Sequence, residues 1–316
     1  MSVRRPNHTD DIRVTKEDEA RALLPAMMEA RDRFMELVDE LRPELHRYCA
    51  RMTGSVFDGE DIVQETLAKA YYALGQMLQP PNLRPWLFRI AHNCAIDFLK
   101  RYEQKNVEPV VTVPDRAEPE ETSVDPALVE AALTVFVGLP PTQRSALILK
   151  DVLGHSLGES AATMGTTVGA VKAALSRARR NVAKASSAPD LPAAPVSAER
   201  QATLRRYVDL FNDHNWNGLR NLLAQESQLE IVSRVQQRVA DAGYFDRYAE
   251  ITKDEDMRAK MGSVDGVPAI AIFRPPSSPL PAYFILLESA GGEVVLIRDF
   301  RYIPYIAADA RFSPAK

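Results

Sequence analysis

The chain has 316 residues, of which 46% are hydrophobic, 26% charged and 7% aromatic, and its formal net charge is −4. Single hydrophobic cores rarely grow beyond ~250–300 residues, so this length predicts two or three domains. No apolar run approaches the ~20 residues of a membrane span, and a polar stretch follows Arg5 where an export signal would be apolar. These features exclude an integral membrane or exported protein, and we expect a cytoplasmic protein without a membrane partner.

The cysteine content bears on metal and redox chemistry. Cys49 and Cys94 are the two cysteines, and they lie far apart on predicted helices. Such a pair cannot by itself form a zinc site or a disulfide framework. The sequence therefore predicts buried free thiols, no metal site and no cofactor.

Charge is distributed unevenly along the chain. Residues 107–130 are strongly acidic, whereas residues 166–185 contain basic residues and no acidic one, namely Lys172, Arg177, Arg179, Arg180 and Lys184. Neighbouring blocks of opposite sign indicate separate tasks, and a basic block is typical of a nucleic-acid contact. The overall negative charge therefore does not exclude a nucleic-acid partner.

Composition divides the chain into six segments. A polar arm covers 1–30, and two linkers are predicted where periodicity is lost, an acidic and proline-containing one at 103–127 and a Pro/Ala/Ser one at 186–198. The domains between them are predicted at 31–102, 128–185 and 199–316. The expected fold is multidomain, with two all-α domains followed by an α+β domain.

The first domain shows helical spacing throughout. Leu37, Leu41, Leu45, Tyr48 and Met52 predict one helix that stops near Gly54. Acidic residues at 58–61 favour the start of a second helix, and Pro85-Trp86 opens a third.

The second domain contains a helix-turn-helix pattern. A short helix at 157–164 ends at Gly165, and a second begins after Thr166 and Thr167, whose hydroxyls can cap it. On that second helix Val171, Leu175 and Ala178 share a core face. The residues left for DNA are Lys172, Ser176, Arg177, Arg179 and Arg180. The second helix of such a pair can lie in the major groove, while the alternative is a solvated basic helix.

The third domain begins with amphipathic helices and continues with strands. Residues 229–233, 267–273, 282–288 and 293–300 are rich in β-branched and aromatic residues. Helices followed by antiparallel strands predict a sheet with helices on one face.

Two strings of the first domain carry a family resemblance. Asp61-Ile62-Val63-Gln64-Glu65-Thr66 and Pro85-Trp86-Leu87-Phe88-Arg89-Ile90-Ala91-His92-Asn93 resemble region 2 of bacterial sigma-70 factors, and the basic second domain resembles their region 4. Two regions joined by an acidic linker are similar to the extracytoplasmic-function group. The resemblance implies a transcription initiation factor, not an enzyme, whose partners are promoter DNA and core RNA polymerase, contacted at the β′ clamp and the β flap.

The resemblance also implies roles for individual residues. It implies polymerase docking through Asp61, Gln64 and Glu65, and contacts to the −10 element through Lys69, Arg84, Arg89, Asn93 and Lys100. His92, beside Asn93, is expected to be structural or a phosphate contact. The −35 element would be read by Lys172, Ser176, Arg177 and Arg180. The chain departs from the commonest family form at Ala173 and Ala174, where a serine and an arginine are usual, so the −35 sequence need not be that of other members.

The third domain resembles the SnoaL-like branch of the NTF2-like fold, a cone of curved sheet around helices. Strings such as Tyr207-Val208-Asp209-Leu210-Phe211-Asn212 and Ile297-Arg298-Asp299-Phe300-Arg301-Tyr302 carry it.

A pocket lined by Tyr207, Phe211, His214, Tyr248 and Asp299 is one hypothesis, with an unknown small ligand. Acid–base catalysis by Asp299 and His214 is disfavoured, because His214 lies in a predicted loop and arginines flank Asp299. The expected role is regulation of the front half. The alternatives are a SnoaL-like enzyme or ligand sensor with a DNA-binding front, and a plain helix-turn-helix activator.

Overall fold

The computed structural model describes residues 16–77, 79, 81–105, 133–185, 197–232, 235–239 and 243–315. Met1–Arg42 and Pro43–Lys316 form two separate units. Most of the predicted acidic linker and of the Pro/Ala/Ser linker lies outside the described residues, as does the first half of the arm. The domain boundaries therefore remain predictions.

The first unit contains helix α1 (Lys16–Asp39), and α2 begins at Arg42. The single helix predicted through Leu37 and Met52 is thus wrong, because the chain turns between the two helices and Leu41 donates a backbone hydrogen bond to Val38. Pro43 explains the break, since proline cannot donate a backbone hydrogen bond and suits the first turn of a new helix.

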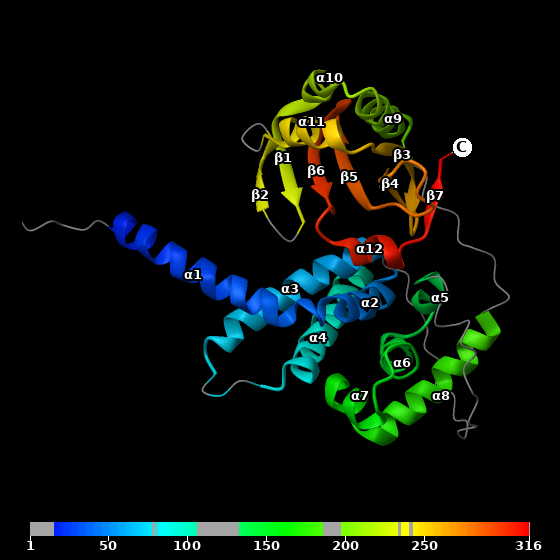
Figure 1. Cartoon of the computed structure of the whole chain (residues 1–316). Helices are drawn as coiled ribbons and strands as arrows, with labels where there is room; N and C mark the ends of the chain where they lie inside the picture. The colour runs from blue at the N-terminus through cyan, green and yellow to red at the C-terminus, as the bar shows by residue number, and fades with distance from the viewer. Residues whose placement is uncertain are drawn as a thin grey trace, which may run out of the picture. The chain divides into compact units, whose positions relative to one another are not determined.

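The first helical block comprises α2 (Arg42–Thr53), α3 (Val56–Leu74) and α4 (Leu83–Lys105) (Figure 1). Ser55 caps α3, because its hydroxyl accepts a hydrogen bond from the backbone N–H of Asp58 at 3.2 Å. The rings of Tyr48 and Phe88 meet edge to face at 5.9 Å in the core. Cys49 and Cys94 are buried and free, as expected.

The second helical block comprises α5 (Leu133–Val137), α6 (Pro141–Leu147), a π-helical turn at Ile148–Val152, α7 (Leu157–Met164) and α8 (Val168–Ala185). A buried arginine joins it to the first block: Arg144 donates hydrogen bonds to the carbonyls of Met52, Val137 and Leu139. Such a guanidinium satisfies three carbonyls at once, which fixes where α6 packs.

A single seven-stranded sheet forms the C-terminal domain, with strand order β2-β1-β6-β5-β4-β3-β7. β1 and β6 run parallel, and the other neighbours are antiparallel. The strands are β1 (Leu223–Ile231), β2 (Val235–Arg238), β3 (Arg258–Val264), β4 (Val267–Phe273), β5 (Tyr283–Ala290), β6 (Glu293–Asp299) and β7 (Phe312–Pro314). The four predicted strands are confirmed, and β2, β3 and β7 were not predicted.

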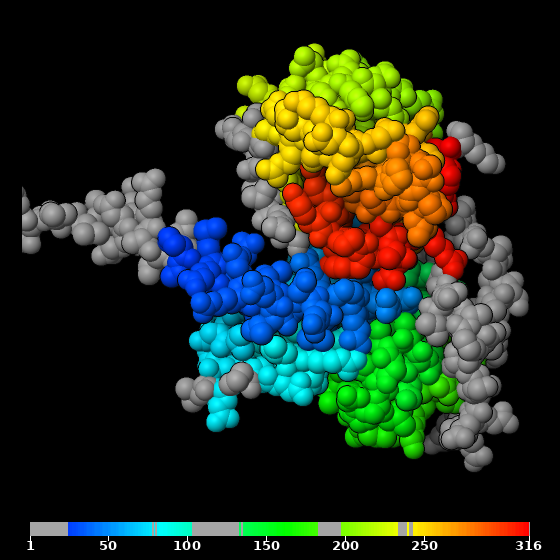
Figure 2. Space-filling model, viewed as in Figure 1, coloured from blue at the N-terminus to red at the C-terminus, as the bar shows by residue number. Residues whose placement is uncertain are grey.

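Helices cover both faces of this sheet. On one face α9 (Ala198–Asn212), α10 (Trp216–Arg220) and α11 (Tyr244–Asp254) enclose a core that includes Tyr207 and Ile270. On the other face Phe284 and Phe300 pack with Phe57 of α3 and with α12 (Pro304–Asp309). The prediction of helices on one face is therefore incomplete. In Figure 2 the red surface of α12 lies against the blue surface of α2.

Candidate nucleic-acid interface

The predicted helix-turn-helix is confirmed in α7 and α8. Ser156 and Glu159 form a reciprocal capping box at the start of α7, and Gly165 ends it in the left-handed conformation at φ 62°. The Thr167 hydroxyl then accepts a hydrogen bond from the backbone N–H of Ala170 at 3.2 Å, which caps α8. These local bonds fix the turn that presents α8.

One face of α8 is buried and the other is polar. The three residues predicted for the core face are buried, namely Val171, Leu175 and Ala178. Ala174, which was not predicted to belong to that face, is buried as well. Lys172 and Arg177 are exposed, whereas Ser176 and Arg180 are half-buried. A helix with cations on its open face and small residues between them can approach a phosphate backbone closely.

Arg179 does not belong to this open face. Its guanidinium donates to both carboxylate oxygens of Asp151, at 2.8 and 3.1 Å, and so ties α8 to the π-helical turn. The sequence assigned Arg179 to DNA, and the structure adds a bidentate ion pair with Asp151 that the sequence did not predict.

A second polar face lies on α4. Arg89, Asn93 and Lys100 are exposed, and their spacing places them on one side of the helix. Lys69 is also exposed, on α3, and its ammonium contacts Glu65 at 2.7 Å and the Cys94 sulfur of α4 at 3.4 Å. The structure thus brings four of the five predicted −10 residues to the surfaces of α3 and α4.

Arg84 is held differently. It donates to both carboxylate oxygens of Glu44, at 2.5 and 3.2 Å, and lies 5.6 Å from the centre of the Phe88 ring. Glu159 of α7 is a further partner at 4.0 Å. These contacts join α2, α4 and α7, so Arg84 has a structural task that the sequence did not show.

His92, next to Asn93, is a core residue. Its Nδ1 contacts the Tyr48 hydroxyl at 2.8 Å and the Ser145 hydroxyl at 3.1 Å. Burial lowers the pKa of His92 to about 4, so its ring is neutral at pH 7. A phosphate contact by His92, one of its two expected roles, is therefore excluded in this arrangement, and the other, a structural role, is the one it has.

The predicted docking residues lie on α3 but are half-buried rather than exposed. Glu65 contacts Lys69 at 2.7 Å and Arg101 at 3.6 Å. Asp61 accepts a hydrogen bond of 2.5 Å from Arg298, on strand β6 of the C-terminal domain. Gln64 lies between them in sequence, and its amide nitrogen is buried without a hydrogen-bond partner among the described residues.

Asp61 sits in an unusual electrostatic setting. Burial raises the pKa of its carboxyl to about 6, and the carboxylates of Glu230 and Asp58 add to the rise, while Arg298 opposes it. Arg298 also donates to Glu230 at 2.8 Å, so one guanidinium pairs with two carboxylates, those of Asp61 and Glu230. Removal of that guanidinium would leave these carboxylates facing one another.

The start of α3 is bound to the C-terminal domain at further points that the sequence did not predict. Its first backbone N–H, at Val56, donates to Asp265 at 3.1 Å, and Tyr305 donates to Glu60 at 2.8 Å. The Phe57 ring lies 5.0 Å from that of Phe300. These partners are separated by more than two hundred residues, so local patterns carry no signal for them.

Four of the five predicted pocket residues of the C-terminal domain are buried. Tyr207, Phe211, Tyr248 and Asp299 are fully buried, and His214 is exposed. Neither of the two hollows described in this domain is lined by them. These two hollows therefore give no support to the hypothesis that the five residues line a ligand pocket.

Asp299 is satisfied by its own neighbours. It accepts hydrogen bonds from Tyr244 at 2.7 Å, Tyr248 at 3.1 Å and Arg301 at 2.9 Å. Burial raises the pKa of both tyrosines, so they remain donors. Because His214 is not among these partners, the structure does not assemble an acid–base pair from Asp299 and His214.

The described ranges contain no group of three His, Cys, Asp or Glu side chains placed to hold a metal ion. None of the helices described is both long and apolar enough to cross a bilayer.

Known families match the two helical blocks. Residues 37–105 match the family described as Sigma-70 region 2, and residues 130–182 match Sigma-70, region 4. These two segments contain every candidate residue on α3, α4 and α8. The C-terminal sheet lies outside both segments.

Curated relatives extend the similarity. ECF RNA polymerase sigma factor SigG of Mycobacterium tuberculosis is 33% identical over 232 residues, which cover 64% of this chain and 62% of SigG. The alignment thus spans less than two thirds of SigG. ECF RNA polymerase sigma factor SigD of Mycobacterium bovis is 31% identical over 159 residues, covering 47% of this chain and 74% of SigD. Among solved structures, extracytoplasmic function sigma factor SigJ of Mycobacterium tuberculosis is similar with a TM-score of 0.34 and 20% identity, over 84% of this chain and 95% of SigJ.

Proposed function

The chain belongs to the family of ECF RNA polymerase sigma factors, and from that premise we propose that it binds core RNA polymerase, recognises −10 and −35 promoter elements and initiates transcription. The observation that carries the proposal is the pair of polar faces on α4 and α8, each inside a segment that matches a sigma region. A plain activator would need only the second face.

Run-off transcription tests this function. Purified core polymerase, the chain and DNA from upstream of the chain's own coding region are combined, and transcripts that require the chain are expected. Promoter binding without any transcript would instead favour the helix-turn-helix activator.

The −35 role falls to α8, with Lys172 and Arg177 as phosphate or base contacts and Ser176 and Arg180 beside them. We place the −10 role on Arg89, Asn93 and Lys100 together with Lys69. Opening of the duplex there requires cations for the backbone and a polar group for an unstacked base, and the Asn93 amide can both donate and accept. Arg84 would have to release Glu44 before it could contact DNA.

Asn93→Ala should change base preference in the −10 element more than overall affinity. Loss of one base contact costs about 1–3 kcal/mol at the position read and nothing elsewhere. Promoter opening is measured on a set of −10 variants, with Lys100→Ala as the matched control from the same face. Lys100→Ala should lower affinity for every variant alike. An Asn93→Ala protein with the parental ranking of promoters would remove the base-reading role.

The docking role falls to Asp61, Gln64 and Glu65 on α3, for the β′ clamp, while the second helical block would meet the β flap. Glu65→Lys should weaken binding to core polymerase by roughly ten- to hundredfold, because a hydrogen bond to a charged group contributes roughly 1.5–3 kcal/mol. The measurement is affinity for core polymerase, with thermal melting as the fold control.

Glu65→Gln is the control for Glu65→Lys. It removes the charge without placing a third cation beside Lys69 and Arg101, which lie 2.7 and 3.6 Å from Glu65. We expect Glu65→Gln to lose less affinity than Glu65→Lys. Parental affinity in both variants would show that Glu65 faces no polymerase surface.

For the C-terminal domain we propose an NTF2-like cone that regulates the front half. A curled sheet with α9, α10 and α11 on one face supports the fold. The regulatory role is supported by the contacts of Arg298, Tyr305 and Asp265 with the start of α3. Because Arg298 engages the Asp61 carboxylate that would also contact polymerase, the domain would restrain docking until it is displaced.

A further inference from the structure

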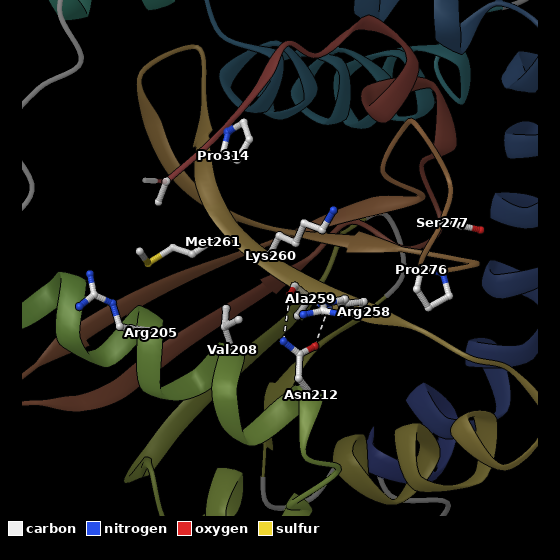
Figure 3. Close-up of a pocket in the computed structure, with 11 residues that line it drawn as sticks. Arg205, Val208, Asn212, Arg258, Ala259, Lys260, Met261, Pro276, Ser277 and Pro314 are labelled. Carbon is white, nitrogen blue, oxygen red and sulfur yellow. Dashed lines mark hydrogen bonds between the residues drawn. The ribbon is translucent and has the colours of Figure 1, made fainter.

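A hollow of about 840 Å³ lies on the C-terminal domain, away from the residues that contact α3. Figure 3 shows it between α9 and the outer edge of β3, with Arg205 on the helix and Arg258 and Lys260 on the strand. The Pro276–Ser277 loop and the end of β7 complete its rim. Ligand sites commonly have volumes of roughly 300–1,000 Å³.

The walls of this hollow are fixed to one another. β7 pairs with β3 from Gly262 to Val264, and the backbone N–H of Ala315 donates to the Met261 carbonyl at 2.9 Å, so the open edge of β3 lies before Met261. The Asn212 side chain takes the place of a strand there: it donates to the carbonyl of Ala259 at 3.0 Å and accepts from its N–H at 2.8 Å (Figure 3). This pair of hydrogen bonds protects an open edge and holds α9 against β3.

The charge of the hollow is entirely positive. Arg205, Arg258 and Lys260 are exposed, and no acidic residue lines it. None of the three forms an ion pair with any carboxylate in the described parts of the chain; Lys260 lies instead over the Phe273 ring, 4.3 Å from its centre. Elsewhere on the domain several arginines are paired, as Arg220 is with Asp246. Three cations without counter-charges around one concavity favour an anion.

The lining between these cations is apolar. Val208 is buried at its base, Met261 is half-buried, and Pro276 and Pro314 close two sides. From this combination we propose that the hollow binds an organic phosphate, with the phosphate groups on Arg205, Arg258 and Lys260 and a flat or apolar body against Val208 and Met261. A DNA duplex would contact the rim and leave the apolar base unused.

The test is titration calorimetry of the full-length chain at about 0.15 M salt, where exposed charges are screened beyond ~8 Å. The probes are ATP and inorganic pyrophosphate. ATP should bind more tightly than pyrophosphate, because only ATP has a body for the apolar base. Each of Arg205→Gln, Arg258→Gln and Lys260→Gln should weaken ATP binding about tenfold. Lys260→Arg, which keeps the charge, should retain most of the affinity.

Arg247→Gln is the matched control, since Arg247 is an exposed cation of the same domain outside the hollow. It should bind both probes as the parent does, and melting temperatures of all variants verify folding. Equal ATP affinity in parent and hollow variants would overturn the proposal. So would absence of ATP binding combined with loss of duplex-DNA affinity in a variant that carries Arg205→Gln, Arg258→Gln and Lys260→Gln together, which would make the surface a DNA contact. Neither titration involves polymerase, so its failure leaves the proposed transcription function untouched.

Discussion

Lys172→Ala combined with Arg177→Ala should weaken promoter binding about hundredfold at low salt, because each cation contributes roughly 1–3 kcal/mol at a DNA interface. Both side chains are exposed on α8, opposite the face that Val171 and Ala178 bury. If both contact phosphates, the slope of log affinity against log salt should fall by about two units, since each neutralised phosphate contributes about 0.9. Affinity for a promoter duplex is measured over a series of salt concentrations.

Two controls separate DNA contact from general charge and from folding. Arg206→Ala with Arg247→Ala removes the same charge from exposed positions of the C-terminal domain, and should leave the slope unchanged. Arg179→Ala should instead lower the melting temperature, because it breaks the ion pair with Asp151 inside the second block. A parental slope in the α8 double variant would make the basic face a solvated surface.

The helix-turn-helix could be predicted because its signals are local. Ser156 and Glu159 are three residues apart, and Gly165 and Thr167 mark one turn, so each bond that shapes it joins close neighbours in sequence. The break between α1 and α2 was missed since the apolar spacing continues across it, although Pro43 was a usable signal.

The sheet was predicted in part for a related reason. β4, β5 and β6 contain long apolar runs, whereas β3 contains Arg258, Lys260 and Gly262 and is only partly buried. A signal for β3 was nevertheless present in Asp265-Gly266, where both residues have positive φ and join β3 to β4 as a two-residue hairpin. β7 has three residues, too few for any alternating pattern.

Candidate site residues could be assigned to helix faces but not to partners. Arg84, Arg179 and Glu65 all lie on predicted helices, yet each is engaged by a side chain of another element. The junction between α3 and β6 is the extreme case, because Asp61 and Arg298 meet only through the tertiary fold. Sequence spacing reports which residues share a face, and pairing across elements depends on packing that spacing does not encode.

The second large effect is expected from a substitution at the junction between α3 and β6. Arg298→Ala should raise the affinity of the full-length chain for core polymerase about thirtyfold, since a partly buried hydrogen-bonded ion pair contributes about 2 kcal/mol to the restrained state. The variant leaves every proposed polymerase contact on α3 in place, because the substituted residue lies on β6. It also leaves Asp61 and Glu230 without their shared cation, so the two carboxylates would repel one another across the junction.

The affinity of the Arg298→Ala chain for core polymerase is compared with that of the Arg274→Ala chain. Arg274 belongs to the same domain but pairs with Glu255 and does not contact α3. Arg274→Ala should bind core polymerase as the parent does. Tyr305→Phe, which removes the hydrogen bond to Glu60, should act in the same direction as Arg298→Ala but more weakly. Weaker core binding by Arg298→Ala at an unchanged melting temperature would mean that the C-terminal domain supports docking. Unchanged binding would show that the contact of the C-terminal domain with α3 does not affect docking on polymerase.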